Sequence, residues 1–490
     1  MSPWISALSD LFLLAIGLMV LLVIIVFVRD ITQTRDAVLR NYPVIGHFRY
    51  IFSSLGEFFR QYFFAMDREE LPFNRAQRQL IERASRDKST SIAFGSTRSM
   101  DYPGTPIFEN AAFPPLEQDN LPSATVVIGE GYCQQPYAAS SLINVSAMSY
   151  GAISRPAILA LSKGVRTAGC WLNTGEGGLS PYHLEGGADI VFQFGTAKYG
   201  VRDENGELSE EKIKTIAALD QVKMIEIKLS QGAKPGKGGI LPATKVTEEI
   251  SKIRGIPMGS PSLSPNRHLD VSNVDELLDL ISKVKSASEI PVGFKTVIGS
   301  MDWLDELFEK IKQRGLDSAP DFLTIDSGDG GTGAAPMSLM DHVGLTINES
   351  LPLVVDALIK HGLRQRIKVI TSGKLVNPAG VAWALCCGAD FVNSARGFMF
   401  ALGCIQSLKC NKNTCPTGIT THDKRLQRGL NPEDKAVKVA NYVSQINHAV
   451  ETIAHSCGVA EPRALRRHHV RLVQSSGHSV RLSELHPQPG

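Results

Sequence analysis

From about residue 140 onward, short β-branched segments alternate with helical ones, which is the pattern of a parallel α/β fold. The helical stretches include RPAILALSKGVRTAG and NPAGVAWALCCG. Eight strand–helix units predict a (β/α)8 TIM barrel, whereas a doubly wound open sheet rarely has so many and needs a switch point that the sequence does not show. The eight strand candidates are 142–150, 171–175, 190–195, 224–230, 291–297, 321–327, 368–373 and 390–396.

Polar residues stand near the C-terminal ends of these strands, where barrel enzymes place their catalytic groups. Lys295 is the most informative, because a charge inside an apolar strand needs a partner or a ligand anion. An ion pair with Glu226 is the structural alternative to a ligand. The strand-end residues are Ser149, Thr174, Gln193, Glu226, Lys228, Lys295, Asp326, Ser372 and Arg396.

Three glycine-containing loops follow the last three strands: SGDGGTGAAP, TSGKL and NSARG. Glycine lets backbone N–H groups approach an anion closely, and barrels often bind phosphate after strands seven and eight. Flavin mononucleotide fits, since it has one phosphate and a ring that can lie over the barrel mouth; a phosphosugar would suit the loops but would not explain the cysteines described below. No G-x-G-x-x-G opens a helix after the early strands, which argues against a Rossmann domain. We expect the phosphate at Gly330, Gly331, Thr332, Gly333, Ser372, Gly373, Lys374, Ala395 and Arg396, with Ala147, Met148, Ser149, Thr174 and Lys295 beside the ring.

Three of the eight cysteines cluster just after the last strand, as Cys404, Cys410 and Cys415 followed by Pro416. Thiolates hold iron–sulfur clusters, and proline after the last cysteine occurs in ferredoxin-like runs. A zinc site would normally show C-x2-C pairs and a fourth ligand. Structural thiols are the simplest alternative. The spacing predicts an iron–sulfur cluster, and the other, unpaired cysteines suggest a reducing compartment.

The N-terminus carries an uncharged apolar run at residues 11–28. At about 1.5 Å per residue it spans roughly 27 Å, close to the thickness of a bilayer core, so it predicts a membrane helix rather than a signal peptide or a buried core helix. Arginines follow it, which places the main body in the cytoplasm and the chain in the inner membrane as a single-pass protein. The aromatic and arginine-rich stretch 41–64 suits either the membrane surface or packing on the globular domain.

The predicted organisation is an anchor at 1–40, a helical or irregular extension at 41–140, a barrel at 141–460 and a basic tail at 461–490. A solvated tail is expected, with contact to anionic lipid as the alternative. Net charge is +2, which gives no reason to expect a nucleic-acid partner.

Five motifs in order resemble the FMN-binding glutamate synthase family: SAMSYGAIS, NTGEGG, IEIKLSQGAKPGKGG, DSGDGGTGAAP and C-x5-C-x4-C-P-x-G. The resemblance covers roughly residues 40–460. It implies a barrel that binds FMN and a [3Fe-4S] cluster on the three clustered cysteines, and a reaction in which 2-oxoglutarate and ammonia form 2-iminoglutarate, which reduced flavin converts to glutamate. It also implies catalytic roles for Lys295 and Glu226, and substrate contacts at Met148, Ser149, Lys228 and Lys234.

The sequence also departs from the large glutamate synthases. Residue 1 is Met, not the nucleophilic cysteine of their glutaminase domain, so ammonia is expected from a separate glutaminase subunit or from solution. A C-terminal β-helix domain is not expected either. Between Cys410 and Cys415 the histidine usual in the family is missing, which bears on cluster potential.

The sequence is compatible with three functions. The first is a glutamate synthase-like oxidoreductase, and the second is a membrane-bound flavin and iron–sulfur dehydrogenase of another amino or oxo acid that passes electrons to quinone. The third is a non-catalytic flavin-binding membrane subunit. An electron-donor protein is an expected partner of the first.

Overall fold

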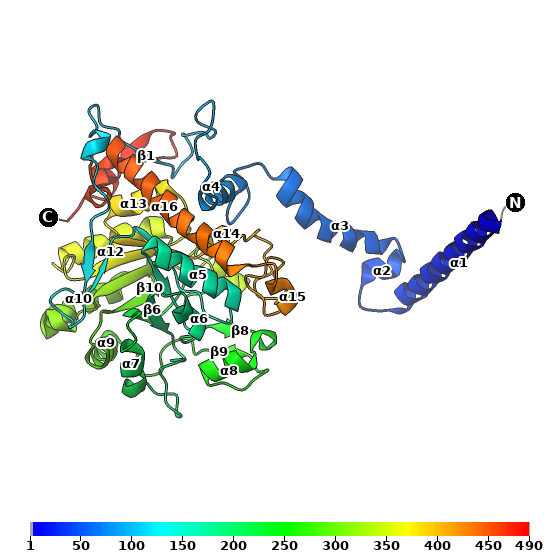
Figure 1. Ribbon diagram of the computed structural model, residues 1–490, viewed down its shortest axis with the longest axis horizontal. Helices are drawn as coiled ribbons and strands as arrows, with labels where there is room; N and C mark the ends of the chain where they lie inside the picture. Colours follow the sequence, from blue (N-terminus) through cyan, green and yellow to red (C-terminus); the bar gives the residue numbers. More distant parts are fainter. Residues whose placement is uncertain (1–2, 490) are drawn as a thin grey trace. The chain divides into compact units, whose positions relative to one another are not determined.

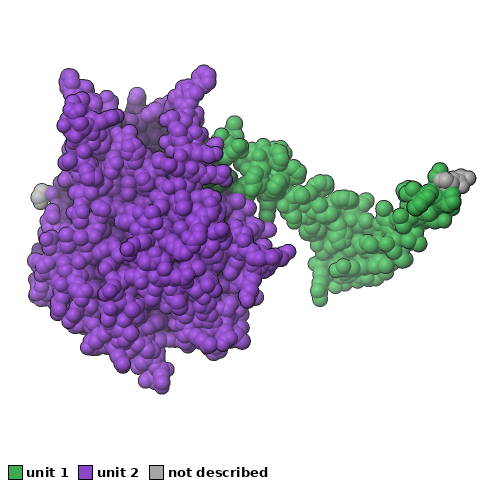
Figure 2. Space-filling model, viewed as in Figure 1, with its two compact units in different colours: residues 1–78 green, residues 79–490 purple. Residues whose placement is uncertain are grey.

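The structure is a computed structural model that describes residues 3–489. The chain forms two compact units, Met1–Arg78 and Gln79–Gly490 (Figure 2). This division falls inside the predicted extension 41–140, whose second half belongs to the larger unit.

The first unit is helical. It contains α1 (Pro3–Thr32), α2 (Ala37–Asn41), α3 (Gly46–Phe59) and the π-helical turn η1 (Arg60–Phe64) (Figure 1). Within the described residues, α1 is the one helix that is long and apolar enough to cross a membrane, with a mean hydropathy of 3.4 over its most apolar window.

The second unit is built on a closed barrel of eight parallel strands, which confirms the predicted fold. Neighbouring strands pair in chain order, and β13 closes the ring by pairing with β4. The strands are β4 (Ile143–Val145), β5 (Trp171–Asn173), β6 (Asp189–Phe194), β7 (Val222–Lys228), β10 (Val292–Val297), β11 (Phe322–Asp326), β12 (Lys368–Ser372) and β13 (Phe391–Ser394).

Helices follow most strands and pack outside the barrel (Figure 1). Their ends carry local signals: Ser154 caps α5 through the Ala157 N–H, and Gly169 ends that helix at a φ of 67°. Close packing of α5 on α16 needs Gly164, since a Cβ there would lie 2.6 Å from the Val439 side chain. These helices are α5 (Arg155–Ala168), α6 (Pro181–Glu185), α7 (Glu210–Ala217), α9 (Val274–Ser288), α10 (Asp302–Arg314), α12 (Ile347–Lys360), α13 (Pro378–Cys387), α14 (Arg396–Ala401) and α16 (Pro432–Ser456).

A hairpin of β2 (Val126–Ile128) and β3 (Tyr137–Ala139) seals the N-terminal end of the barrel. Ile128 and Tyr137 join a buried cluster with Trp171, Phe322 and Phe391, the first residues of three barrel strands. Burying these side chains removes apolar surface from water and blocks this end. The opposite end, at the C-terminal ends of the strands, therefore holds the site.

An insertion between β7 and β10 contributes to that opposite end. It comprises β8 (Ile240–Leu241), β9 (Ser262–Leu263) and α8 (Glu248–Arg254), with β8 and β9 paired antiparallel.

The basic C-terminal segment is folded, so the expectation of a solvated tail is wrong. Its strands β14 (Val470–Val473) and β15 (Ser479–Arg481) pair antiparallel, and β14 also pairs with β1 (Pro106–Phe108). Arg467 is only 2% exposed and forms a 2.6 Å ion pair with Asp356. The positive charges of this segment find carboxylates on the barrel unit, which is why they are compatible with burial.

Candidate active site

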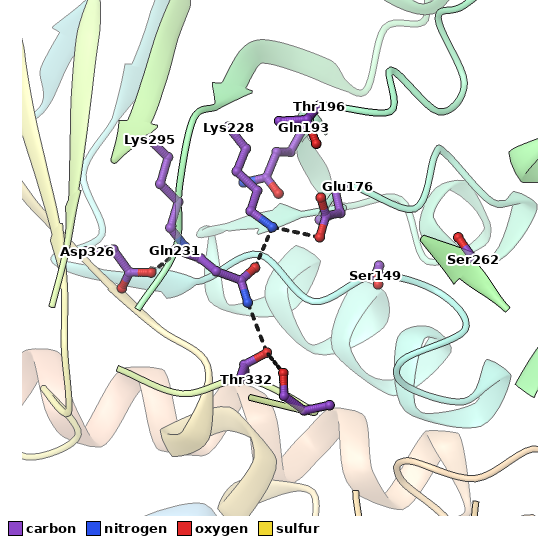
Figure 3. Close-up of polar contacts among 12 residues, drawn as sticks. Ser149, Glu176, Gln193, Thr196, Lys228, Gln231, Ser262, Lys295, Asp326 and Thr332 are labelled. Carbon is purple, nitrogen blue, oxygen red and sulfur yellow. Dashed lines mark hydrogen bonds and ion pairs between the residues drawn. The ribbon is translucent and has the colours of Figure 1, made fainter. Parts of the chain in front are cut away.

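Two lysines face each other in register at the C-terminal ends of β7 and β10. Lys228 is the strand neighbour of Lys295. Both are buried, and like charges this close need compensation. Each has its own carboxylate: Lys228 lies 2.6 Å from Glu176, and Lys295 lies 3.1 Å from Asp326 (Figure 3).

The Lys295–Asp326 pair is held by neighbouring donors. The Gly232 N–H donates to Asp326 at 2.9 Å, and the Ser372 hydroxyl donates to it at 2.5 Å. Burial by itself lowers the pKa of Lys295, but Asp326 and then Glu226 outweigh burial and raise it. Burial works in the opposite direction on Asp326, and Lys295 with these donors keeps its pKa low. The site thus holds a fixed cation at the barrel axis, and its direct ion pair is with Asp326, not Glu226.

Glu226 is held by neutral groups. Its carboxylate accepts from Asn173 at 2.8 Å, from Gln193 at 2.6 Å and from Thr324 at 2.5 Å. The side chain is 1% exposed. Its hydrogen bonds therefore tie strands β5, β6, β7 and β11 together, and its catalytic role stays a prediction.

Lys228 is connected to the glycine-rich loop that follows β11. The Gln231 side-chain oxygen accepts from Lys228, and its amide nitrogen donates to the Thr332 hydroxyl at 2.9 Å (Figure 3). The Gln231 side chain therefore links Lys228, the cation at the end of β7, to any ligand group that binds near Thr332.

Three cations surround Glu176. Lys228 contacts it directly, and Lys234 and Arg254 both act on its charge from nearby. Lys234 is 3% exposed, and burial, followed by repulsion from Lys228, lowers its pKa to about 8. Within the described residues, the Lys234 amine has no ion pair or hydrogen bond of its own. This part of the mouth carries excess positive charge and suits an anionic substrate.

Arg254 ends α8 and reaches into the same region. Its guanidinium donates to Ser262 at 3.0 Å, to the Tyr150 carbonyl at 3.1 Å and, more weakly, to the Ser149 hydroxyl at 3.5 Å. Its Nε is buried without a partner among the described residues. Arg254 thereby joins the insertion to the loop after β4, on which Ser149 lies.

The predicted phosphate loops meet around Asp329. Lys374 forms a 2.7 Å ion pair with Asp329, and Arg396 lies close enough that both Asp329 and Asp326 act on its charge. The Gly331 backbone lies close to Arg396, since a Cβ there would lie 2.9 Å from the Arg396 Nε. Two cations against the local carboxylate, beside a glycine-rich backbone, fit the phosphate of FMN.

Other predicted cofactor contacts fall on closely packed loops. Gly373 has a φ of 155° and lies against Ser327, where a Cβ would come within 2.4 Å of the serine Cβ. Gly333 has open space around its Cα, and Gly330 packs on Gly232. Ala395 precedes Arg396 at the start of α14. These positions follow the C-terminal ends of barrel strands, and their contacts with a cofactor stay a prediction.

The two loops beside the predicted ring position also approach each other closely. A Cβ on Gly175 would lie 2.6 Å from the Ser149 nitrogen. Ala147 and Met148 are partly exposed on the loop after β4. Thr174 is fully buried, and its hydroxyl accepts from the Gln193 N–H at 3.0 Å, so that group is used internally.

The cysteine loop is only partly assembled. Cys410 and Cys415 lie close enough to influence each other, and the buried Lys245 amine donates to the Cys410 carbonyl at 2.8 Å. The Gln406 N–H donates to the Cys404 sulfur at 3.4 Å. Over residues 3–489, no three Cys, His, Asp or Glu side chains converge closely enough to hold a metal ion. The thiols suit an iron–sulfur cluster by their chemistry, but their arrangement here does not form its site.

Glu176 and Arg254 were not predicted from the sequence as site residues. Glu176 lies in NTGEGG, where the glycines on both sides indicate a turn rather than a functional side chain. Arg254 lies 26 residues after Lys228 in the insertion, and no local pattern links the two. A count of charges near predicted strand ends would have found Glu176, but only the fold brings Arg254 to the mouth.

Fold and site together define a (β/α)8-barrel enzyme with a cation-rich C-terminal mouth. The family model described as "Conserved region in glutamate synthase" matches residues 105–460. A relative from Bacillus subtilis, the glutamate synthase large subunit-like protein YerD, is 41% identical over 94% of each chain. The archaeal-type glutamate synthase [NADPH] of Thermotoga neapolitana is 36% identical over 66% of this chain and 60% of its own, and the archaeal glutamate synthase [NADPH] of Methanocaldococcus jannaschii is 36% identical over 67% and 61%.

The chain belongs to the glutamate synthase family and is a glutamate synthase-like oxidoreductase. It spans about three fifths of the length of the archaeal and archaeal-type relatives.

Proposed function

We propose that this chain forms L-glutamate from 2-oxoglutarate and ammonia with reduced FMN. The observation that carries the proposal is the cluster of cations around Glu176, in which the buried Lys234 forms no ion pair within the part of the chain that the structure describes. A dicarboxylate supplies the negative charge that this cluster lacks, and its oxo group can then lie toward Lys295, which is held as a cation. A cation there stabilises negative charge that develops during the reaction.

FMN, when bound, supplies the hydride that reduces the imine carbon. The residues of the chain bind and orient: Lys374 and Arg396 would hold the phosphate, and Lys234 would bind a substrate carboxylate. Lys228 and Gln231 connect the cations around Glu176 to the loop at Thr332. The sealed N-terminal end of the barrel leaves the mouth as the way in.

The flavin is tested through Arg396. Arg396→Ala removes a charge-assisted partner of the phosphate, worth about 1.5–3 kcal/mol, so it should weaken FMN binding roughly 10- to 100-fold. Flavin absorbance and titration of the apoprotein measure this. Arg428→Ala, on the exposed turn after α15 (Lys424–Gln427), is the control. Wild-type protein that neither carries nor takes up FMN contradicts the cofactor.

The reaction is tested in both directions with the full chain. When 2-oxoglutarate and ammonia are both added to protein whose flavin has been chemically reduced, the flavin should be reoxidised and glutamate released. Neither compound alone should have this effect. Excess glutamate should partly reduce the oxidised flavin. No response to either pair contradicts the proposed reaction.

A second candidate is favoured by α1: a membrane-bound flavin dehydrogenase of another amino or oxo acid that passes electrons to quinone. It predicts quinone reduction by membranes with an amino acid other than glutamate as donor. Substrate-dependent quinone reduction without glutamate formation would support this dehydrogenase function over glutamate synthesis.

We also propose that Cys404, Cys410 and Cys415 hold an iron–sulfur cluster once iron and sulfide are present, with three thiolates suiting [3Fe-4S]. The support is the donor chemistry and the closeness of Cys410 to Cys415. Metal and sulfide analysis with electron paramagnetic resonance on anaerobically purified protein tests it. Stoichiometric zinc, or three free thiols with no metal, contradicts it.

A further inference from the structure

Helix α3 carries a continuous apolar face. Its large apolar residues recur at spacings of three and four, so they fall on one side of the helix. We call this face the aromatic stripe; it consists of Phe48, Ile51, Phe52, Leu55, Phe58 and Phe59. These side chains are 40–65% exposed, although burying them would be favourable.

The other side of α3 is polar. Away from the stripe lie Arg49, Ser53 and Glu57, followed by Arg60 at the start of η1, and no charged residue interrupts the stripe. An amphipathic helix with aromatic residues on one face and arginines on the other is the type that lies in a membrane interface.

Hydrogen bonds hold the start of α3 to the end of α1. Asp30, near the end of α1, is 2% exposed; its carboxylate accepts from the Val44 N–H at 2.8 Å and lies 2.9 Å from the His47 ring nitrogen. Asp36 caps α2 through the Val38 N–H at 2.8 Å and accepts from the Tyr50 hydroxyl. This hydrogen-bonded corner fixes where α3 begins relative to the last turn of the apolar helix.

We propose that α3 lies in the headgroup–acyl boundary of the membrane that α1 crosses, with the aromatic stripe in contact with lipid. The occupant is lipid because the corner keeps α3 beside the point where α1 leaves the bilayer. The arginines of the corner and of the polar face, which include Arg29, Arg35, Arg40, Arg49 and Arg60, complement anionic headgroups. The proposal rests on α1 being a membrane helix and is independent of the glutamate reaction.

The test uses the full chain in vesicles of phosphatidylcholine and phosphatidylglycerol that contain a lipid with a photoreactive group in its acyl chain. After illumination, mass spectrometry locates the lipid-labelled residues. The proposal expects label on α1 and on the stripe. Label on α1 alone overturns the proposal for α3 but still supports α1 as a membrane helix. If neither helix is labelled, both the proposal for α3 and the assignment of α1 as a membrane helix are overturned.

Neighbouring positions on opposite faces provide matched variants. Phe52→Asp places a charge in the stripe, and Ser53→Asp places the same charge on the polar face. Lipid labelling of α3 should fall by roughly fivefold or more in Phe52→Asp and stay unchanged in Ser53→Asp, because a charge disfavours burial in the interface. Equal effects of the two changes, or crosslinks between the α3 helices of two copies in place of lipid label, overturn the proposal.

Discussion

At the scale of single residues, Lys234 gives the clearest pH dependence. Its pKa of about 8 means that it is charged below pH 8 and loses its charge as the pH rises through that value. Lys228, Glu176 and Lys237 also act on it. If it binds a substrate carboxylate, kcat/KM for 2-oxoglutarate should fall above pH 8 with one deprotonation.

Two substitutions separate this effect from others. Lys234→Met should raise the KM for 2-oxoglutarate about 10- to 100-fold at pH 7, the equivalent of about 1.5–3 kcal/mol. It should also abolish the fall in kcat/KM above pH 8, called the alkaline step below. Lys234→Arg should keep much of the affinity and also remove the step, because arginine stays protonated. Steady-state kinetics between pH 6.5 and 9.5 measure both, and a step that survives in the arginine variant belongs to another group.

Lys295 should set the reduction potential of the bound flavin. Lys295→Met removes the cation at the barrel axis and leaves Asp326 without its partner, so the reduction potential should become more negative and turnover should be lost. Lys285, whose amine lies 3.4 Å from Asp321, offers a control in the methionine variant Lys285→Met. Spectroelectrochemistry measures the potential, and an unchanged value with near-normal turnover shows that the Lys295–Asp326 pair is only structural.

At the scale of elements, one carboxylate ties the C-terminal strands to β1. Glu109 accepts from Arg481 at 2.8 Å and from Arg471 at 2.9 Å, and chiefly the Arg481 hydrogen bond, opposed by burial and aided by Arg471, lowers its pKa from 4.5 to about 2. A lowered carboxyl pKa stabilises the fold above the unfolded value and loses that effect as pH falls.

Glu109→Gln should therefore lower the free energy of unfolding at pH 7. The gap to wild type should narrow as pH falls below 4.5 and close near 2. Since these groups are partly exposed, the gap should also shrink in high salt. Denaturant unfolding at several pH values measures this difference in the free energy of unfolding. If the difference does not vary with pH, the substitution acts through packing rather than through the charge of Glu109.

The elements also show what the sequence could predict. All eight barrel strands were predictable, because short, mostly apolar runs alternate with helical patterns along this part of the chain. The folded C-terminus was not, because RALRRHHVRL reads as a charged tail until the fold supplies Asp356 and Glu109 as partners.

The candidate site divides in the same way. Residues on strands or in glycine loops, such as Lys295 and Arg396, were found because their positions follow from the barrel. The identity of Asp326 as the partner of Lys295, and the arrival of Arg254 from the insertion, depend on contacts between segments that no local pattern links.

At the scale of the whole molecule, we expect α1 to cross the membrane once with the barrel unit in the cytoplasm, because Arg29, Arg35 and Arg40 lie on the C-terminal side of the apolar run 11–28. A C-terminal green fluorescent protein fusion should fluoresce, and the corresponding alkaline phosphatase fusion should be inactive. Carbonate-washed membranes should retain the chain. An active phosphatase fusion reverses the orientation, and release by carbonate removes the anchor.

The closure of the barrel has a consequence for synthesis. The first barrel strand, β4, pairs with the last, β13. Strand β1 pairs with β14, which lies still later in the chain. Such pairings between distant segments slow folding, and domains emerge from the ribosome N-terminus first. The early strands therefore have exposed edges until most of the chain has been made. A nascent chain that stalls before β13 has an unclosed sheet, which is prone to aggregation and proteolysis.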